Sequence, residues 1–298
     1  MGSIKETEIA VAEALIAAIE SAEDGKKWVM PWDAATGIPT NPTTQRPYAG
    51  GFNYFVLMMG GLQYGDSRWA GASQWFKSKN PVKKGEKGTG IFFPRFNCAK
   101  CSVGIGWGKK CRNGHAVVKS ADKKFSGWGS SVVFNNQQTS SPLPSSERKD
   151  VDPSVGFEAA AKIVEKMGSD LRHGGARAFY DVKSDFIMVP EAGDFKTVAD
   201  YWAVVMHEHA HWTGAKSRLD REGIVKFTSF GTEEYAYEEL IAEIGSAFVC
   251  SHIGVEREGL FDNHVAYLAS WKKKLREDPG AVRRAANEAG KVMRFLLK

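Results

Sequence analysis

The chain has 298 residues, of which 43% are hydrophobic and 25% are charged, a composition typical of a globular protein. Lysine and arginine outnumber aspartate and glutamate by 40 to 35, which gives a formal net charge of +5 at pH 7. The sequence has no apolar run of about 18 residues, which argues against a membrane span. The first helix-like stretch, Ile4 to Glu20, resembles neither a secretory nor a transit peptide. With four cysteines and no export signal, we expect a cytoplasmic protein with reduced thiols.

Positive charge is concentrated in the N-terminal half. Residues 1–134 contain 18 Lys or Arg against 10 Asp or Glu, whereas the rest of the chain has 22 against 25. A stretch rich in serine, proline and charged residues lies between two apolar-patterned regions and is typical of a linker. The sequence therefore predicts a basic domain over 1–136, a linker over 137–154 and a second domain over 155–298.

The basic domain is expected to mix helices and strands. Ile4 to Ala22 has the pattern of an amphipathic helix, and Ser73 to Lys79 that of a short one. Thr89 to Arg95 and Gly129 to Asn135 are typical of strands. We interpret the remainder as short strands and glycine-rich loops.

Aromatic and basic residues alternate in this domain. Six of the nine tryptophans lie there: Trp28, Trp32, Trp69, Trp75, Trp107 and Trp128. Cations that neutralise phosphates and exposed rings that stack on bases are what a single-strand binder needs. The same rings are equally compatible with a hydrophobic core, so composition alone leaves nucleic-acid binding open.

Three cysteines and a histidine form a possible metal-binding motif. Cys98, Cys101, Cys111 and His115 have the spacing C-x₂-C-x₉-C-x₃-H. The residue types and the C-x₂-C corner fit a structural Zn²⁺. Free thiols in a glycine-rich loop are an equal alternative, and Cys250 is expected in the core of a helix.

The second domain begins with a helical pattern at Val155 to Gly168. Arg177 to Val182 and Phe186 to Pro190 then alternate like two strands joined by a tight turn. The segment Phe186 to Val189 is a candidate edge strand for pairing with a substrate peptide. A plain core strand is equally compatible with this pattern.

The segment Lys196 to Ala215 predicts a helix that carries an H-E-x-x-H motif. His207 and His211 lie four residues apart on one face, within reach of one tetrahedral Zn²⁺. Glu208 is then placed to act as general base on a water molecule. The apolar stripe on the opposite face, Val198, Trp202, Val205, His209 and Trp212, indicates that His209 points away from the metal.

A second predicted helix, Tyr235 to Phe248, offers the third ligand. Glu239 and Glu243 lie four residues apart opposite an apolar stripe, as in gluzincins, with Glu239 as ligand and Glu243 orienting His207 or His211. Glu238 is a competing ligand, and a solvated acidic face is the alternative for the pair. The residue that would stabilise an oxyanion is left open between Tyr235, Tyr237 and His252.

These motifs resemble the ArdC antirestriction proteins of conjugative plasmids. The resemblance to their zincin domain rests on His207–Gly214, Arg218-Leu219 and Glu238–Glu243. Upstream, Pro31-Trp32, Tyr48–Asn53 and Val82–Gly88 resemble their single-stranded-DNA-binding domain. The stretch around residues 98 to 115 is a departure from the family pattern.

The resemblance implies an α+β fold with a basic ssDNA-binding domain and a gluzincin-like zinc metallopeptidase domain. It implies one catalytic-type Zn²⁺ and contacts to ssDNA from Trp32, Tyr48, Asn53, Lys83, Lys84 and Lys87. The implied function is protection of incoming plasmid DNA during conjugation. DNA-bound restriction machinery is one candidate for the protein substrate, which the sequence leaves open, and no membrane partner is expected. Two alternatives stay open: a pure ssDNA-binding protein with a structural or silent zinc site, and a protease that clears proteins crosslinked to DNA.

Overall fold

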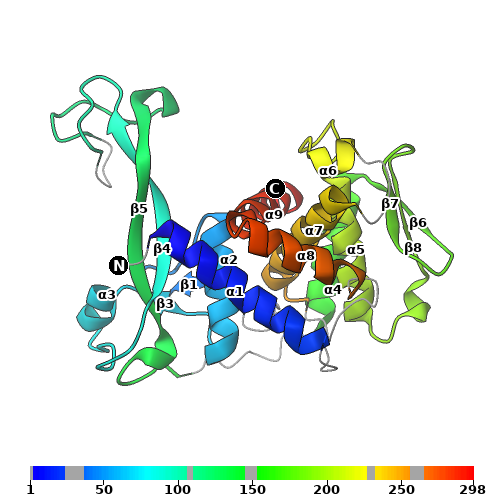
Figure 1. Cartoon of the computed structure of the whole chain (residues 1–298), viewed down its shortest axis with the longest axis horizontal. Coiled ribbons are helices and arrows are strands. Elements are labelled where there is room, and N and C mark those ends of the chain that lie inside the picture. The colour runs from blue at the N-terminus through cyan, green and yellow to red at the C-terminus, as the bar shows by residue number, and fades with distance from the viewer. Residues whose placement is uncertain (1–2, 24–36, 106–109, 145–152, 227–231, 256–264) are drawn as a thin grey trace.

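The computed structural model describes residues 3–23, 37–105, 110–144, 153–226, 232–255 and 265–298. It has two α+β domains in which helices gather at the centre of the molecule and the sheets lie at its two sides (Figure 1). Among the helices that the structure describes, none combines the length and apolarity that crossing a bilayer requires.

The N-terminal domain is built on a long antiparallel hairpin. Its helices are α1 (Ile4–Glu23), α2 (Gly51–Tyr64) and α3 (Ala72–Lys77). Its strands are β1 (Thr40–Asn41), β2 (Arg46–Pro47), β3 (Trp69–Ala70), β4 (Thr89–Cys98) and β5 (Lys123–Asn135), with β5 in the centre of a three-stranded sheet in the order β3-β5-β4. The hairpin and the tip that joins its two strands project beyond the helices in Figure 1, and we call this projection the arm.

The C-terminal domain sets helices against a small mixed sheet. The helices are α4 (Pro153–Met167), α5 (Val198–Trp212), α6 (Glu222–Val225), α7 (Glu233–Ile253), α8 (Val265–Glu277) and α9 (Gly280–Leu296). The strands are β6 (Asp170–His173), β7 (Phe179–Asp181) and β8 (Phe186–Val189), in the order β6-β8-β7. Because β8 pairs on both sides, it is the core strand of the two alternatives, and the expected substrate edge at Phe186–Val189 is wrong.

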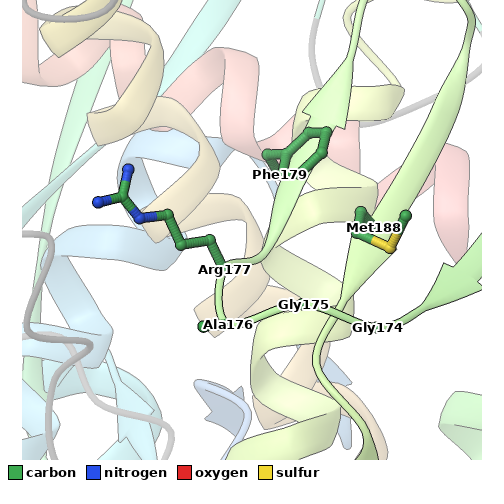
Figure 2. A pocket seen from close by; sticks show the side chains of 6 residues that line it. All are labelled: Gly174, Gly175, Ala176, Arg177, Phe179 and Met188. Atoms are coloured by element: carbon green, nitrogen blue, oxygen red, sulfur yellow. The ribbon is translucent and has the colours of Figure 1, made fainter.

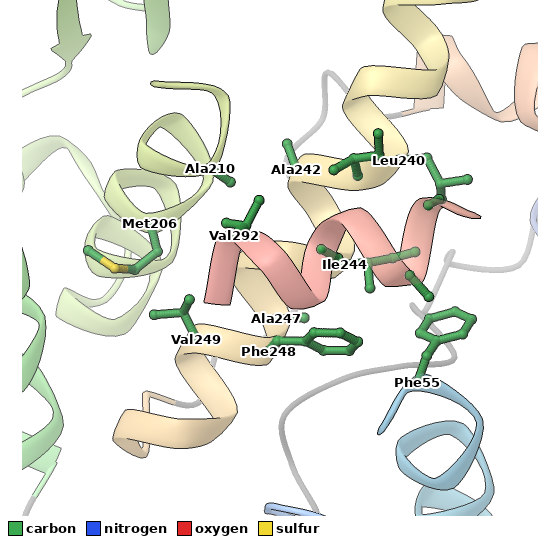
Figure 3. Close-up of a cluster of buried hydrophobic side chains, with 14 of the residues drawn as sticks. Phe55, Met206, Ala210, Leu240, Ala242, Ile244, Ala247, Phe248, Val249 and Val292 are labelled. Atoms are coloured by element: carbon green, nitrogen blue, oxygen red, sulfur yellow. The ribbon is translucent and has the colours of Figure 1, made fainter. Parts of the chain in front are cut away.

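The two domains share one hydrophobic core. Helix α1 packs on α8 and α9, and α2 packs on α9. Phe55 of α2 lies beside Phe248 of α7 within the buried cluster drawn in Figure 3, with ring centroids 6.5 Å apart. Tyr54 approaches the same phenylalanine more closely, at 4.6 Å. The N-terminal domain therefore rests directly on helix α7.

Glycine makes the close approach of α2 and α9 possible. A Cβ at Gly51 would lie 2.0 Å from the carbonyl oxygen of Ala286, and one at Gly290 would lie 3.0 Å from the Cα of Gly51. Phe52 N donates to the side-chain oxygen of Asn287 at 3.1 Å across the same contact. Backbone-to-backbone packing of this kind leaves no room for a side chain at position 51.

The expected linker is partly folded. Gln138 and Thr139 are buried, and Gln138 donates to Glu86 and to the backbone of Lys87 at 2.9 Å. Helix α4 starts at Pro153. The boundaries at 136 and 155 stay a prediction, but the start of the interval packs against the first domain.

Candidate metal centre

Helices α5 and α7 pack side by side and bring three potential metal ligands together. The Nε2 atoms of His207 and His211 are 3.1 Å apart. The carboxylate oxygens of Glu239 lie 3.5 Å from Nε2 of His207 and 3.4 Å from Nε2 of His211. Donors on one tetrahedral ion would be about 3.4 Å apart, given metal–ligand distances of about 2.0–2.2 Å. The three side chains therefore form a group that could hold a divalent metal ion.

Both helices begin at a capping threonine. The hydroxyl of Thr197 accepts a hydrogen bond from Asp200 N at 3.0 Å, and that of Thr232 accepts one from Tyr235 N at 3.2 Å. Such caps satisfy backbone N–H groups that have no partner within the helix. They fix where each helix starts and so which side chains share its inner face.

His209 lies on the other side of α5, as predicted. It is fully buried, donates from Nδ1 to Val205 O at 2.7 Å and accepts from the Ser169 hydroxyl at 2.8 Å. Burial lowers its pKa to about 4, so the ring is neutral. The apolar stripe predicted for this helix is wrong at its first residue, because Val198 is 52% exposed.

The Nδ1 atom of each candidate ligand histidine, on the side away from Nε2, has an acidic partner. Glu243 Oε1 lies 3.0 Å from Nδ1 of His207, and Glu238 Oε1 lies 3.4 Å from Nδ1 of His211. Glu238 also forms a buried ion pair with Arg221 at 2.5 Å. Carboxylates in these positions fix the orientation and tautomer of a ligating imidazole. Glu238, the competing ligand in sequence, therefore supports His211 from behind.

Negative charge dominates the site. Although burial disfavours charged imidazolium, Glu243 and Glu239 raise the pKa of His207 well above its ordinary value. Against the same effect of burial, Glu239 and Glu238 raise the pKa of His211 to about 9. The excess of carboxylate charge over the fixed positive charge of Arg221 suits a bound cation.

Glu208, the predicted proton acceptor, lies near the candidate ligands. Its carboxyl group is buried, and burial raises its pKa although His207 and His211 act in the opposite direction. The backbone of Tyr180 in β7 donates a hydrogen bond to it. A carboxylate whose pKa is raised toward neutrality is suited to general acid–base chemistry.

Two phenols approach the same site. The ring of Tyr235 stacks on His211, with centroids 6.1 Å apart and planes 13° apart. Burial and Glu239, which accepts its hydrogen bond, both raise the pKa of Tyr235. Tyr267 of α8 lies 5.8 Å from Tyr235, and burial together with Glu239 and Glu208 raises its pKa to about 12. Both hydroxyls stay protonated and can act as donors.

The other two residues left open for an oxyanion lie elsewhere. The Tyr237 hydroxyl faces Ala281 O of α9 at 3.4 Å. His252 is exposed in the last turn of α7, more than two turns beyond Glu243. Tyr235 is therefore the residue of the three that the structure places beside the ligands.

Strand β7 borders the site and forms one edge of the sheet. The loop that leads into it helps to line a hollow formed by Gly174, Gly175, Ala176, Arg177, Phe179 and Met188 (Figure 2). Arg218 anchors the β7–β8 hairpin to α5 by pairing with Asp185 at 2.5 Å and lying 3.8 Å from the centroid of the Trp212 ring.

Two of the residues expected to contact DNA are engaged inside the protein. The hydroxyl of Tyr48 donates to Trp69 O at 2.9 Å, and burial raises its pKa to about 12. Asn53 donates to Phe92 O at 2.6 Å and accepts from Phe92 N at 2.9 Å. Their contact with DNA stays a prediction, but their polar groups hold α2 against β4 and the loop against β3.

The expected lysines are exposed on a turn. Lys84 and Lys87 are solvent-exposed, and exposed Lys83 donates to Gln137 O at 3.0 Å. Trp32 lies outside the described residues. Of the remaining tryptophans, Trp69 and Trp75 are core residues.

The arm exposes aromatic rings that the sequence did not distinguish from core. Phe125 and Trp128 are 53% and 50% exposed. Phe96 contacts Phe125 at 6.1 Å between centroids, and Phe125 contacts Trp128 at 5.9 Å. We call these three rings the arm strip. Exposed basic residues flank it: Arg95, Lys123 and Lys124.

The four residues of the cysteine motif converge at the arm tip. Cys98, Cys101, Cys111 and His115 each offer a donor atom within 4.8 Å of the others. Cys250 is buried in α7, as expected.

Comparison with protein families assigns both halves of the chain. Residues 5–104 match the N-terminal domain of anti-restriction factor ArdC. Residues 158–288 match a zincin-like metallopeptidase. The second match contains all three candidate ligands and Glu208.

Relatives and solved structures agree. Two proteins named DNA primase TraC from Escherichia coli are 36% and 34% identical over 96% of this chain, which spans only 26% and 19% of their lengths. Uncharacterized protein y4eC of Sinorhizobium fredii is 30% identical, over 95% of this chain and 88% of its own length.

Crystal structures of antirestriction protein ArdC from plasmid R388 superpose on this chain. The metal-free form gives a TM-score of 0.70 and the Mn(II)-bound form 0.68, each at 27% identity over 97% of this chain and 96% of theirs. Family models, relatives and fold thus converge on one assignment. This chain belongs to the ArdC-type antirestriction family, with an ArdC N-terminal domain followed by a zincin-like metallopeptidase domain.

Proposed function

We propose that this protein binds single-stranded DNA and protects plasmid DNA from restriction as it enters the recipient cytoplasm during conjugation. We further propose that its second domain cleaves peptide bonds. The observation that carries the proposal is the buried group of His207, His211 and Glu239 with Glu208 beside it, in one chain with an ArdC N-terminal domain.

The donor set favours Zn²⁺ as the bound ion. Two imidazoles and one carboxylate leave a fourth position open, the arrangement of catalytic rather than structural zinc. Such an ion lowers the pKa of a water molecule and polarises a peptide carbonyl. Glu208 accepts the proton of the attacking water and delivers it to the leaving amide nitrogen. The protonated hydroxyl of Tyr267 can donate a hydrogen bond to the carbonyl oxygen as negative charge develops on it, and that of Tyr235 can do so on leaving Glu239.

Single-stranded DNA is proposed to lie along the arm and the turn at Lys83–Lys87. The arm strip offers exposed rings for base stacking, and its flanking cations neutralise phosphates. Because stacking on exposed rings does not depend on base identity and the strip lies on strands rather than on a groove-reading helix, we expect strand binding without sequence choice.

The protein substrate is proposed to be bound to the same DNA strand. Since Tyr54 and Phe55 of the N-terminal domain pack on Phe248 of α7, the helix that carries Glu239, a strand bound to that domain would be held close to the active site. A DNA-associated protein then meets the active site at an elevated effective concentration. Restriction enzymes acting on incoming DNA fit this description.

A second function is a binding protein in which the metal site is catalytically silent. The extensive ion pairing around Glu238 and Glu243 would also suit a purely structural ion. A protease that clears proteins crosslinked to DNA is a further alternative, because it needs the same two activities.

Conjugation into restricting and non-restricting recipients tests the function. Wild-type protein should raise transfer into the restricting strain alone. A Phe125→Ala/Trp128→Ala variant should lose this protection, and Glu208→Gln should lose it only if proteolysis is required. Equal transfer with and without the wild-type protein would contradict the proposal. Protection retained by Glu208→Gln would favour the pure binding protein.

A further inference from the structure

The arm tip is formed by two tight turns that face each other. In the first, Ser102 N donates to Cys98 O at 2.8 Å, and Ser102 has a positive φ of 57°. In the second, Gly114 N donates to Cys111 O at 2.9 Å, with a φ of 80° at Gly114. Cys111 N closes this turn by donating to His115 O at 2.9 Å. Each turn thus presents two donor side chains at its ends.

The donor atoms of the two turns lie at regular separations. Sγ of Cys101 is 3.7 Å from Sγ of Cys111. Nδ1 of His115 is 3.8 Å from Sγ of Cys98 and 3.6 Å from Sγ of Cys111. All four donors lie within 4.8 Å of one another.

These separations match the edges of a zinc tetrahedron. With Zn–S near 2.3 Å and Zn–N of about 2.0–2.1 Å, tetrahedral angles place two sulfurs about 3.8 Å apart, and sulfur and nitrogen about 3.6 Å apart. The pairs that bridge the two turns agree with these values to about 0.2 Å. Packing of unrelated thiols does not require four donors to surround one point.

The hydrophobic cluster formed by the described residues of the tip is small. Cys98, Cys111 and Val117 are buried in it, Cys101 and Ile105 pack against them, and the cluster is separate from the main core. So small a cluster buries too little apolar surface to offset the entropy of ordering the two turns. Metal ions commonly supply the missing stabilisation in such modules.

We propose that Cys98, Cys101, Cys111 and His115 bind one structural Zn²⁺ that closes the arm tip. Four protein donors leave no open position, so the ion has no catalytic role. Three thiolates give the site a net charge of about −1, which the exposed side chains of Lys100, Lys110 and Arg112 accommodate. Cys98 is the last residue of β4 and pairs with Lys123, the first residue of β5. By fixing Cys98 there, the ion also fixes the pairing register of β4 and β5 beside the arm strip.

The test uses the full chain with Co²⁺ as the spectroscopic probe for Zn²⁺. Thiolate ligands give cobalt an intense charge-transfer absorption in the near ultraviolet. The imidazoles of His207 and His211 and the carboxylate of Glu239 do not give this band. We expect this band in the wild-type protein, its loss on adding one further equivalent of Zn²⁺ per site, and its loss in Cys98→Ser/Cys111→Ser. Cys250→Ser, which removes a buried thiol in α7, should retain it.

Metal content gives an independent readout. The variant His207→Ala/His211→Ala should retain about one equivalent of zinc per chain by elemental analysis, held at the arm tip. The variant Cys98→Ser/Cys111→Ser should contain about one equivalent less than the wild-type protein, because it lacks the tip ion. Absence of the charge-transfer band from cobalt-loaded wild-type protein would overturn the proposal. So would full reaction of the tip cysteines with a thiol reagent in the presence of excess zinc. Either result leaves the proposed peptidase site untouched, because that site contains no sulfur.

Discussion

Glu243 Oε1 lies 3.0 Å from Nδ1 of His207, on the side of the ring opposite to the candidate metal. The carboxylate is fully buried, so its charge acts on the imidazole without screening by water. We expect Glu243→Gln to weaken metal affinity by about 10–100-fold, because the amide keeps the contact but loses the charge that makes His207 a better ligand. Competition with a fluorescent chelator measures this change.

Glu234 provides the matched control for that variant, since it is an exposed glutamate on the same helix. Glu234→Gln should leave affinity unchanged. Equal affinities for Glu243→Gln and wild type would show that Glu243 does not support the ligand.

The buried pair of Arg221 and Glu238 predicts an effect on stability. Glu238→Ala leaves the guanidinium of Arg221 buried without its main counter-charge, which should lower the free energy of unfolding by about 3–5 kcal/mol. The double variant Arg221→Met/Glu238→Leu should lose less, because neither charge remains. Urea unfolding of the metal-free proteins measures both effects.

An exposed ion pair serves as the comparison. Lys226 and Glu222 interact at 2.7 Å, but both side chains are more than 70% exposed. Lys226→Ala should therefore change the unfolding free energy by less than about 1 kcal/mol. A loss in Glu238→Ala no greater than in Lys226→Ala would contradict this account of the buried pair.

The local patterns of the sequence predicted the metal helices well. Helical spacing predicts that His207 and His211 share one face of α5 and that His209 lies on the opposite face, whereas Glu239 is expected as a ligand from the likeness to gluzincins, with Glu238 as the competitor. Helical spacing does not show which carboxylate contacts which imidazole ring. Glu238 contacts His211 and is held by Arg221, a residue 17 positions earlier in the chain than Glu238. Such an interaction depends on tertiary packing rather than on periodicity.

Other errors have equally physical causes. Glycines at both ends of α2 favour a prediction of loops and short strands there, yet Gly51 at its N-terminal end permits the close contact with α9. Trp69 and Trp128 are indistinguishable by composition, but Trp69 is fully buried in β3 and Trp128 is half-exposed on the arm. The tertiary fold decides whether a single aromatic ring is buried. The number of aromatic residues in the sequence therefore does not separate exposed rings, which could stack on bases, from core rings.

Gly51 should be intolerant of any side chain. The Cβ of Gly51→Ala would meet Ala286 O at 2.0 Å, so α2 and α9 would have to separate. We expect a loss of about 1–3 kcal/mol or more in the free energy of unfolding. Gly193→Ala is the control, because nothing lies within 4 Å of its Cβ position. Equal denaturation midpoints for the two variants would show that the domains do not depend on this contact.

The arm strip should contribute stacking energy but no charge to DNA binding. Phe125→Ala/Trp128→Ala should weaken binding to a labelled oligonucleotide by about 1–3 kcal/mol per base unstacked and leave the salt dependence unchanged. Lys123→Ala/Lys124→Ala should reduce the slope of log affinity against log salt by about 0.7 for each phosphate contact removed. Fluorescence anisotropy at several salt concentrations measures both.

Phe76→Ala is the matched control for the rings, since Phe76 is 72% exposed in the same domain but lies on α3, which packs near the end of β5 distant from the arm strip. Its affinity should equal that of the wild type. If the ring variants bind as tightly as Phe76→Ala, the strand does not stack on the arm.

The role of Glu208 as the proton acceptor of a metallopeptidase is tested most directly by comparing wild type with Glu208→Gln, both zinc-loaded, on an unfolded protein substrate in the presence of ssDNA. The wild-type protein should produce new amino termini, and Glu208→Gln should produce none while retaining the same metal content, because glutamine cannot accept the proton of the attacking water. Cleavage at equal rates, no cleavage by the wild type, or loss of metal from a folded Glu208→Gln variant would contradict the account.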